Sequence, residues 1–350
     1  MQRTRVAVLG AGGYAGALLC RLLARHEGVE LCLLGSARLR AEGVGALGDP
    51  LLGQLPVCGE QEAPARCQAL GVQVVVCATP VEASLDLVPQ LLRSGARVLD
   101  LSGAFRLRDA ERFRQAYGLV HPAPDLLAEA IYVLPEVTGT QGVRAARLVA
   151  NPGCYVTAAL LALAPLGRRG LLRPGAPVFI DGKSGASGAG RQATLELSLV
   201  ELEGEVRPYR IGRHQHAPEI AGVLEELVGQ PVPLSFVPQV CGTRRGLLVT
   251  CHGQLRDGVS AGEAGSALEQ DYAGRARIHL VPAGEVTLRR PVGTPDAWVG
   301  LEVLAGGLFC AVCSLDNLLK GAASQAVQNL NAMIGLPDGT GLDSIWSTVA

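Results

Sequence analysis

The sequence predicts an α/β protein in which a doubly wound parallel sheet is followed by an α+β domain with a mixed or antiparallel sheet. Its 350 residues exceed one ordinary domain. In the first half, short apolar runs alternate with helical patterns, as strand–helix–strand units require. After residue 154 the β-rich runs become longer, which indicates a second architecture.

The first half contains short runs of strand character, and helical patterns follow two of them. Val72–Cys77 is apolar throughout, which is typical of a strand buried on both faces of a sheet. We expect strands at Val6–Leu9, Val29–Gly35, Val72–Cys77 and Arg97–Leu101, and helices at Tyr14–Arg25 and Val81–Ser94.

The second half contains longer runs rich in β-branched residues. We expect strands at Pro177–Asp181, Leu234–Val240, Gly246–Leu255, Trp298–Leu304 and Leu308–Leu315. Apolar residues then recur at helical spacing from Asn317 to Ile334, whereas Asp343–Ala350 shows no clear pattern.

The composition excludes several classes of partner. A net charge of −1 and only 4% aromatic residues argue against nucleic acid and anionic membranes. The longest uncharged run, residues 148–167, is broken by Pro152 and Pro165 and is too short to span a bilayer. Ten cysteines form no regular framework, so we expect a reduced, cytoplasmic protein. Cys310 and Cys313 lack the second ligand pair of a zinc site, and we expect no metal.

Cys154 has the setting of a nucleophile. It ends the segment Asn151-Pro152-Gly153-Cys154, and the apolar run that follows reads as a buried helix. At a helix N-terminus, the unpaired N–H groups and the dipole favour the thiolate form of cysteine. The alternative is that Cys154 is a small packed hydrophobe, as many unpaired cysteines are.

Gly10-Ala11-Gly12-Gly13-Tyr14-Ala15-Gly16 joins the first predicted strand to the first predicted helix. In this position, glycines permit a tight turn and bring backbone N–H groups to a pyrophosphate at the helix N-terminus. The segment therefore predicts a dinucleotide site. A tight turn that binds no ligand is the alternative.

The end of the second predicted strand indicates which dinucleotide is used. The acidic residue that would bind the ribose of NAD is absent, and Ser36 and Arg38 stand there instead. A hydroxyl and a guanidinium suit a 2′-phosphate, which favours NADP(H). Arg38 could alternatively be a solvated surface residue.

The segment Arg213-His214-Gln215-His216-Ala217-Pro218-Glu219 carries two of the six histidines. A proton-transfer histidine held by Glu219 is one interpretation. A metal site is another, but catalytic zinc would need a third ligand. An exposed polar loop is the third.

Further polar residues could bind anions. The glycine- and serine-rich loop from Asp181 to Arg191 offers backbone donors and a guanidinium. Arg106 follows a predicted strand at the edge where open α/β sheets bind ligands, and Arg244 and Arg245 precede another strand. A flexible surface loop and solvated arginines are the alternatives.

These motifs, in this order, resemble the N-acetyl-γ-glutamyl-phosphate reductase family over nearly the whole chain. The family shares its overall design with aspartate-semialdehyde dehydrogenase and glyceraldehyde-3-phosphate dehydrogenase. The matching segments are residues 10–16, 100–107, 132–136, 151–155, 183–191, 214–219 and 316–329. The sequence departs from the family pattern at Gly103-Ala104, Val156, Gln239 and Pro295.

The resemblance implies an NADPH-dependent reduction of N-acetyl-γ-glutamyl phosphate to N-acetylglutamate semialdehyde through a cysteine thioester, a step of arginine biosynthesis. It implies a dinucleotide-binding domain of residues 1–150 completed by a C-terminal helix, 317–350, and a catalytic and dimerisation domain of residues 151–316. It also implies a homodimer or homotetramer whose other partner is a small acyl phosphate.

The resemblance assigns roles to particular residues. It makes Cys154 the nucleophile and His216 the acid–base residue oriented by Glu219, with His214 as the alternative base. It assigns cofactor binding to Gly10, Gly12, Gly13, Tyr14, Gly16, Ser36, Arg38, Ser187, Gly188 and Asn317. It assigns substrate binding to Ser102, Arg106, Asn151, Lys183 and Arg191.

Four alternative functions stay open at this point. Two are related oxidoreductases: an enzyme like aspartate-semialdehyde dehydrogenase, and a reductase of carrier-bound aminoadipyl phosphate. A cysteine hydrolase would also pair Cys154 with His216, but would not need the glycine turn. A regulator that senses NADP would keep the glycine turn but would need no nucleophile.

Overall fold

The computed structural model describes residues 2–343, which form two compact units. Unit 1 is the chain up to Gly153 together with the segment from Ala322 onward, and unit 2 is Cys154–Gly321. The sequence predicted breaks after residues 150 and 316, whereas the structure places them after residues 153 and 321.

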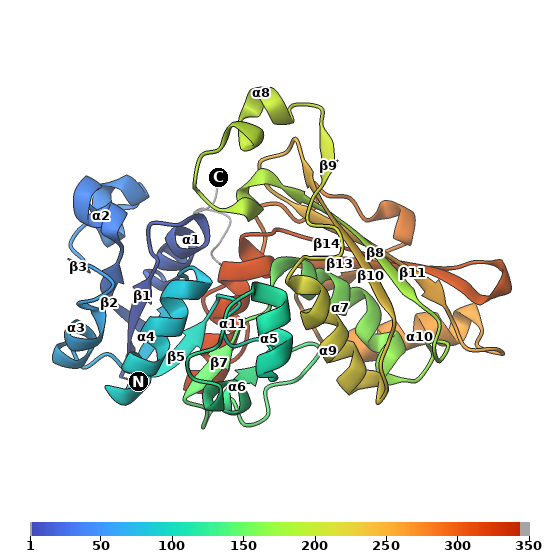
Figure 1. Ribbon diagram of the computed structural model, residues 1–350, viewed down its shortest axis with the longest axis horizontal. Helices are drawn as coiled ribbons and strands as arrows, with labels where there is room; N and C mark the ends of the chain where they lie inside the picture. The colour runs from blue at the N-terminus through green and yellow to red at the C-terminus, as the bar shows by residue number, and fades with distance from the viewer. Residues whose placement is uncertain (1, 344–350) are drawn as a thin grey trace. The chain divides into compact units, whose positions relative to one another are not determined.

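Unit 1 is built on a sheet of seven strands, all paired in parallel, in the order β3-β2-β1-β4-β5-β7-β6 (Figure 1). The chain moves outward from β1 in one direction and from β4 in the other, so the sheet is doubly wound, as predicted. The strands are β1 (Thr4–Leu9), β2 (Val29–Gly35), β3 (Val57–Cys58), β4 (Val74–Cys77), β5 (Arg97–Asp100), β6 (Ile131–Tyr132) and β7 (Leu148–Ala150).

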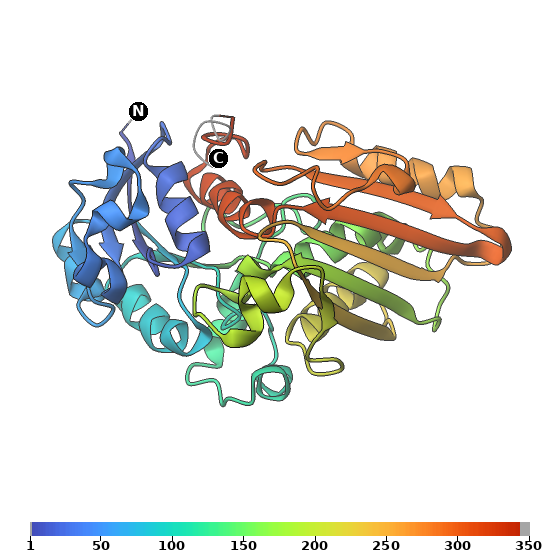
Figure 2. The same ribbon diagram turned by 90° about the horizontal axis from the view of Figure 1, so that it is seen from above.

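Helices cover both faces of this sheet (Figure 2). On one face α1 (Tyr14–Leu23) packs against α11 (Ser324–Ile334), and on the other α3 (Ala63–Ala69) packs against α4 (Val81–Arg93). Right-handed crossovers place α1 and α4 on opposite faces, because the chain leaves β1 and β4 in opposite directions. The remaining helices are α2 (Ala37–Glu42), α5 (Ala110–Tyr117) and α6 (Asp125–Glu129).

The C-terminal helix expected over residues 317–350 is shorter than predicted. A π-helical turn, Leu319–Ala323, leads into α11, which ends at Ile334. The helix stops there because Gly335 takes a positive φ of 77° and Pro337 follows. Residues 335–343 are not helical, and residues 344–350 lie outside the described part of the chain.

Polar side chains of α11 are buried and hydrogen-bonded within unit 1. Asn329 Nδ2 donates to the carbonyl of Val133 and to Oδ1 of Asn151, and Asn331 Oδ1 pairs with Nε2 of His26. These bonds satisfy amides that would otherwise destabilise a buried helix.

Unit 2 contains a mixed sheet of seven strands in the order β12-β13-β14-β11-β8-β10-β9. Two neighbouring pairs, β8 with β10 and β12 with β13, are parallel, and the others are antiparallel, which confirms the predicted mixed sheet. The strands are β8 (Val178–Gly185), β9 (Val206–Pro208), β10 (Leu234–Cys241), β11 (Leu247–Gln254), β12 (Ile278–Leu280), β13 (Ala297–Val303) and β14 (Leu308–Leu315).

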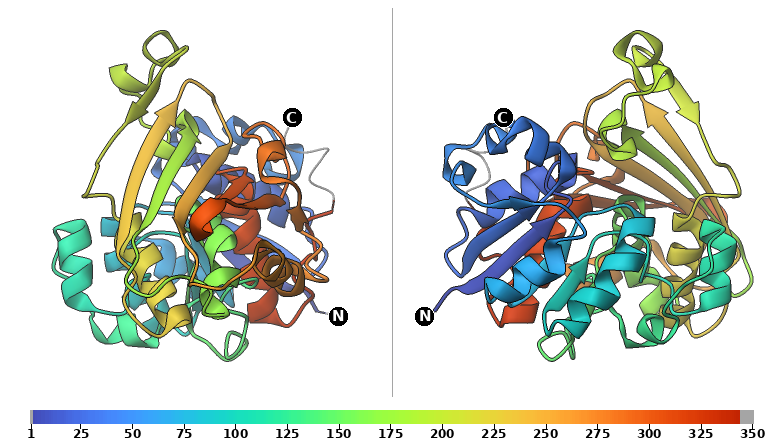
Figure 3. Two further views of the ribbon diagram at one scale, coloured as in Figure 1. Left: turned by 90° about the vertical axis from the view of Figure 1, so that its right-hand side faces the viewer. Right: turned by 60° about the vertical axis from the view of Figure 1, so that its left-hand side comes forward.

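The core of unit 2 forms around α7 (Cys154–Arg168), whose residues Tyr155–Gly167 are all buried. This helix contacts α9 (His216–Val228), α10 (Ala261–Tyr272) and the sheet. The edge strand β9 and the short helix α8 (Leu199–Leu202) lie together at one edge of the sheet (Figure 3). Every helix within residues 2–343 is too short or too polar to cross a membrane.

Candidate active site

Cys154 is the first residue of α7 and is partly exposed. Burial raises the pKa of each of the other nine cysteines, eight of which are buried, while Cys310 is half-buried on β14. A raised pKa keeps these thiols protonated and unreactive at neutral pH. Cys154 therefore has the setting best suited to a nucleophile, because its helix N-terminus favours a thiolate.

Two tyrosines surround the start of α7. The hydroxyl of Tyr155 donates to the carbonyl of Gln239 on β10, at 2.9 Å. Burial raises the pKa of Tyr209 to about 12, and negative charge on the nearby sulfur of Cys154 adds to that rise. Burial raises the pKa of Tyr155 as well. Both phenols therefore stay protonated at neutral pH and can only donate or accept hydrogen bonds.

In the structure, both predicted histidines lie beside the ring of Tyr155, the residue that follows Cys154. The rings of His214 and His216 lie 4.7 Å apart, and that of Tyr155 lies 5.8 Å from the first and 6.0 Å from the second. Phe236 of β10 lies 5.3 Å from Tyr155 and from His214. The aromatic cluster thus links the start of α7 to the start of α9.

His214 is held neutral. Its burial, and then the positive charge of Arg210, lower the pKa of His214 from 6.5 to about 4. Arg210 has a φ of 46° and is the one residue other than glycine with positive φ in the described chain. Such a backbone is strained and persists where neighbouring contacts fix it, here with a hydrogen bond from Arg210 to Gln215.

His216 and Glu219 lie in the first turn of α9. Both side chains are buried, at 8% and 2% exposure, and residues three apart lie on one face of a helix. The helix dipole at this end disfavours positive charge on His216. Within residues 2–343 no three His, Cys, Asp or Glu side chains are arranged to hold a metal, so the third ligand of the zinc alternative is missing there.

The glycine turn of unit 1 leaves no room for a side chain at Gly10, Gly12 or Gly16. Gly10 has a φ of 79°, and a Cβ there would collide with the carbonyl of Ala78 after β4. A Cβ on Gly12 would lie 2.5 Å from Oγ of Ser36, and one on Gly16 would collide with the carbonyl of Gly10. Gly13 caps the N-terminus of α1, whose first residue, Tyr14, is 39% exposed. The loops after β1 and β4 therefore meet at the switch point of the sheet.

Arg38 lies against this turn. Its Nη1 donates to the carbonyl of Gly12 and its Nε to the carboxylate of Glu42, each at 2.8 Å. Ser36 is the N-cap of α2, and its Oγ accepts from the backbone N–H of Leu39. The hydroxyl and guanidinium expected to recognise a 2′-phosphate are both beside Gly12, on unit 1.

The other three residues expected to bind cofactor lie in unit 2 and contact one another. Asn317 donates to Oγ of Ser187 and accepts from the backbone N–H of Gly246. A Cβ on Gly188 would lie 3.5 Å from Nδ2 of Asn317 and 2.9 Å from Oγ of Ser184. In the same unit, Lys183 is partly exposed on β8, and Arg191 is exposed in the following loop.

Ser102, Arg106 and Asn151 form an internal network in unit 1. Ser102 donates to the buried carboxylate of Asp100 at 2.6 Å. Arg106 donates to the carbonyls of Leu101 and Asn151, at 2.7 Å and 2.8 Å. The side chain of Asn151 is 1% exposed and accepts from Asn329. These bonds stabilise the loop after β5 and the segment before Cys154.

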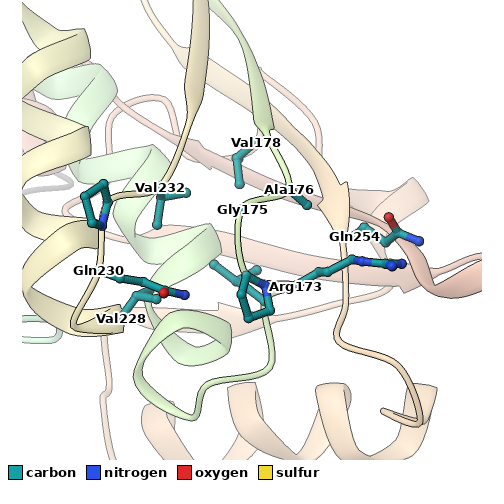
Figure 4. A pocket seen from close by; sticks show the side chains of 11 residues that line it. Arg173, Gly175, Ala176, Val178, Val228, Gln230, Val232 and Gln254 are labelled. Atoms are coloured by element: carbon teal, nitrogen blue, oxygen red, sulfur yellow. The ribbon is translucent and has the colours of Figure 1, made fainter.

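A small pocket opens near the other end of α7, between the starts of β8 and β10 (Figure 4). Its lining includes Arg173, Val178, Val232 and Gln254. An α7 of 15 residues is about 22 Å long, so this pocket is remote from Cys154.

Several residues of the site did not stand out in the sequence. Tyr155 lies in the apolar run and in the family-matching segment 151–155 but was given no role of its own, although it directly follows Cys154. Tyr209 and Arg210 precede His214 by five and four positions, and an aromatic–arginine pair so near a histidine was a usable signal. Gly321 gave no signal, because only the fold shows that it packs against Cys154.

The chain matches two family models: semialdehyde dehydrogenase, NAD binding domain, over residues 5–144, and semialdehyde dehydrogenase, dimerisation domain, over residues 154–317. It is 39% identical to the N-acetyl-γ-glutamyl-phosphate reductase of Heliobacterium modesticaldum, across 97% of this chain and 98% of that protein. The protein of that name from Magnetococcus marinus is also 39% identical, across 99% of each chain.

The chain belongs to the N-acetyl-γ-glutamyl-phosphate reductase family. The resemblance in the sequence motifs is therefore confirmed. Among solved structures, aspartate semialdehyde dehydrogenase II from Vibrio cholerae superposes with a TM-score of 0.73 at 20% identity, covering 95% of this chain and 99% of that one. At that identity the likeness shows a shared two-domain fold. The family's oxidoreductase character and its pyridine-nucleotide domain follow from the same matches.

Proposed function

We propose that the chain reduces N-acetyl-γ-glutamyl phosphate to N-acetylglutamate semialdehyde with release of phosphate, using NADPH, in arginine biosynthesis. The observation that carries this proposal is Cys154 at the N-terminus of α7, joined through Tyr155 to the histidine pair, in a chain similar throughout its length to reductases of that name. A hydrolase would have no use for the glycine turn, and a regulator would have no use for the cysteine.

Cys154 performs the first step. Its thiolate attacks the γ-carbonyl carbon of the acyl phosphate, a C–S bond forms, and the C–O bond to phosphate breaks, leaving a thioester. Backbone N–H groups in the first turn of α7 can donate to the oxyanion that develops.

His216 performs the proton transfers. It donates a proton to the oxygen of the thiohemiacetal and takes that proton back as the aldehyde leaves and Cys154 is regenerated. His214 is uncharged at neutral pH, because its pKa is about 4, so it has no imidazolium proton to supply. Glu219, buried one turn along α9, orients the imidazole of His216 and favours its charged form.

The glycine turn fits a dinucleotide, because a Cβ on Gly10, Gly12 or Gly16 would collide with neighbouring atoms and only glycine permits so tight a turn at the N-terminus of α1. Gly10, Gly12, Gly13, Tyr14 and Gly16 would hold the pyrophosphate side, and Ser36 and Arg38 would hold the 2′-phosphate of NADP(H). Bound NADPH supplies the hydride that reduces the thioester to the aldehyde level. Ser187, Gly188 and Asn317 are further residues that we propose for cofactor binding.

Cationic side chains would hold the anionic groups of the substrate. Lys183 and Arg191, both in unit 2, would bind its carboxylate and phosphate. Ser102, Arg106 and Asn151 would support substrate binding by fixing the loops of unit 1, because their polar atoms bond within that unit.

We further propose that the sheet of unit 2 joins copies of the chain into a homodimer or homotetramer in the cytoplasm. Phe179 is 51% exposed, and alternation along β8 places it on the sheet face opposite the buried Val178 and Ile180. His252 and Cys310 follow it across that face in register. The match of residues 154–317 to a dimerisation domain supports this surface.

A phosphate-dependent assay tests the function. Purified protein is mixed with N-acetylglutamate semialdehyde, NADP and phosphate, and the absorbance of reduced nicotinamide is followed. We expect reduction of NADP only when phosphate is present. Turnover with aspartate semialdehyde or a carrier-bound aminoadipate semialdehyde, but not with the N-acetylglutamate compound, would reject the proposed substrate.

A further inference from the structure

We infer that Asp316 is a positioning residue for Cys154, because it holds the π-helical turn in which Gly321 fixes the place of the cysteine side chain. The inference rests on the proposed role of Cys154 as nucleophile. All residues in the argument belong to unit 2.

The carboxylate of Asp316 organises the chain that follows β14. The side chain is fully buried. Its Oδ1 accepts from the backbone N–H groups of Leu318 and Leu319, at 2.9 Å and 3.2 Å, and its Oδ2 accepts from that of Gly293, at 2.8 Å. A buried carboxylate with this many donors fixes the segments that supply them.

Arg245 balances the charge of this carboxylate. Its Nη2 lies 2.7 Å from Oδ2 of Asp316, and its side chain is only 9% exposed. A buried ion pair contributes little net stability, so its presence is better explained by the geometry that it imposes. The pair joins the turn before β11 to the end of β14.

The turn that Asp316 holds lies directly against the cysteine. The backbone carbonyl of Asp316 accepts from the N–H of Gly321, at 2.9 Å. A Cβ on Gly321 would lie 2.8 Å from Cβ of Cys154, closer than real side chains approach. The backbone at Gly321 therefore packs against Cβ of Cys154 and limits the positions that the cysteine side chain can take. π-helical turns are rare and occur often at functional sites.

This contact of Gly321 with Cys154 matters for the chemistry, since the sulfur must lie where the N-terminal N–H groups of α7 favour a thiolate. A displacement of about 1 Å can cost a hundredfold in rate. Asp316 and Gly321 touch no substrate in this account and act only through Cys154.

Two variants and two matched controls test the inference. Gly321→Ala adds a methyl against Cys154, and Asp316→Asn places an N–H group where Gly293 and Arg245 need an acceptor. The first control is Gly265→Ala in α10, where a Cβ would meet nothing within 4 Å. The second is Asp271→Asn, because Asp271 is 6% exposed, pairs with Arg168 and Arg169, and lies near the far end of α7 from Cys154.

Each purified protein is alkylated with iodoacetamide over a range of pH, and modification of Cys154 is followed by peptide mass mapping. Turnover, KM and NADPH affinity are measured in parallel. We expect both variants to slow alkylation of Cys154 at neutral pH by about tenfold or more, to shift its pH midpoint upward and to lower kcat, with NADPH affinity kept. Both controls should behave like the wild type.

Alkylation of Cys154 at the wild-type rate and pH midpoint in Gly321→Ala would overturn the inference. If Asp316→Asn does not fold, the result for Gly321→Ala alone decides. An equal slowing in the controls would overturn it too. The proposed function fails separately: if Cys154→Ser keeps its turnover, Cys154 is not the nucleophile, whatever its alkylation rate.

Discussion

Nδ1 of His214 accepts a hydrogen bond from the backbone N–H of His216, at 3.2 Å. An accepting Nδ1 and a pKa of about 4 together define a neutral imidazole that carries its proton on Nε2 at neutral pH. His214 therefore has no proton to give to an oxyanion through Nδ1, and it holds the backbone of its neighbour at the start of α9. The two histidines have different roles.

Kinetics of the two asparagine variants separate these roles. His216→Asn should lower kcat by about two to four orders of magnitude, the usual contribution of general acid–base catalysis. His214→Asn should act more on KM than on kcat, because its side chain shapes the site. Steady-state kinetics on both decide, and a larger fall in kcat for His214→Asn would reverse the assignment.

Burial of neutral His214 should make the fold sensitive to acid. Since the pKa is about 4 in the folded chain and 6.5 ordinarily, the unfolded chain binds the proton more readily between those values. The contribution of neutral His214 to the free energy of unfolding is complete above pH 6.5 and is lost as pH falls through 4. It amounts to about 3 kcal/mol. Urea unfolding at several pH values should show a smaller acid loss in His214→Asn than in the wild type. An acid loss in His214→Asn as large as that of the wild type would contradict this role of His214.

Arg38 should set the choice of cofactor. The wild type should prefer NADPH to NADH by about tenfold or more, the scale of one charge-assisted contact. Arg38→Gln should remove most of that preference. Glu42→Gln is the matched control, because it removes the carboxylate that pairs with Arg38 and leaves the guanidinium in place. Titrations of both cofactors that show equal use by the wild type would contradict this role.

The exposed sheet face should be needed for assembly. Phe179→Glu places a charge in the proposed interface and should give monomers in sedimentation velocity, whereas the wild type sediments as a dimer or tetramer. Leu195→Glu is a suitable comparison, because Leu195 is 78% exposed but lies outside the sheet. Its variant should assemble normally, and an oligomeric Phe179→Glu would exclude this face.

Local sequence patterns were sufficient for much of the fold and for part of the site. β2 and β14 have the bounds that their apolar runs predict, and Cys154 begins a buried helix as its motif predicts. The interruption of the last helix by a π-helical turn was not predictable, because periodicity does not report the hydrogen bonds that Asp316 makes. The low pKa of His214 was equally hidden, since it depends on burial and on Arg210, which only the folded chain brings together.

The departure from the family pattern at Gly103 also has a structural reason. A Cβ at this position would collide with the hydroxyl of Tyr117 on α5. The ring of Tyr117 stacks on Phe113 at 4.8 Å, which holds it there. Glycine and tyrosine are therefore coupled in this chain, and neither residue revealed this in the sequence.

The central claim is that Cys154 carries the acyl group, and trapping that thioester tests it most directly. The enzyme is mixed with N-acetyl-γ-glutamyl phosphate without NADPH, quenched in acid, digested and examined by mass spectrometry, with Cys154→Ser as control. We expect one N-acetylglutamyl group on the peptide that contains Cys154, lost when NADPH is added before the quench and absent from the variant. An acyl group on another residue, or none while the enzyme still turns over, would contradict the account.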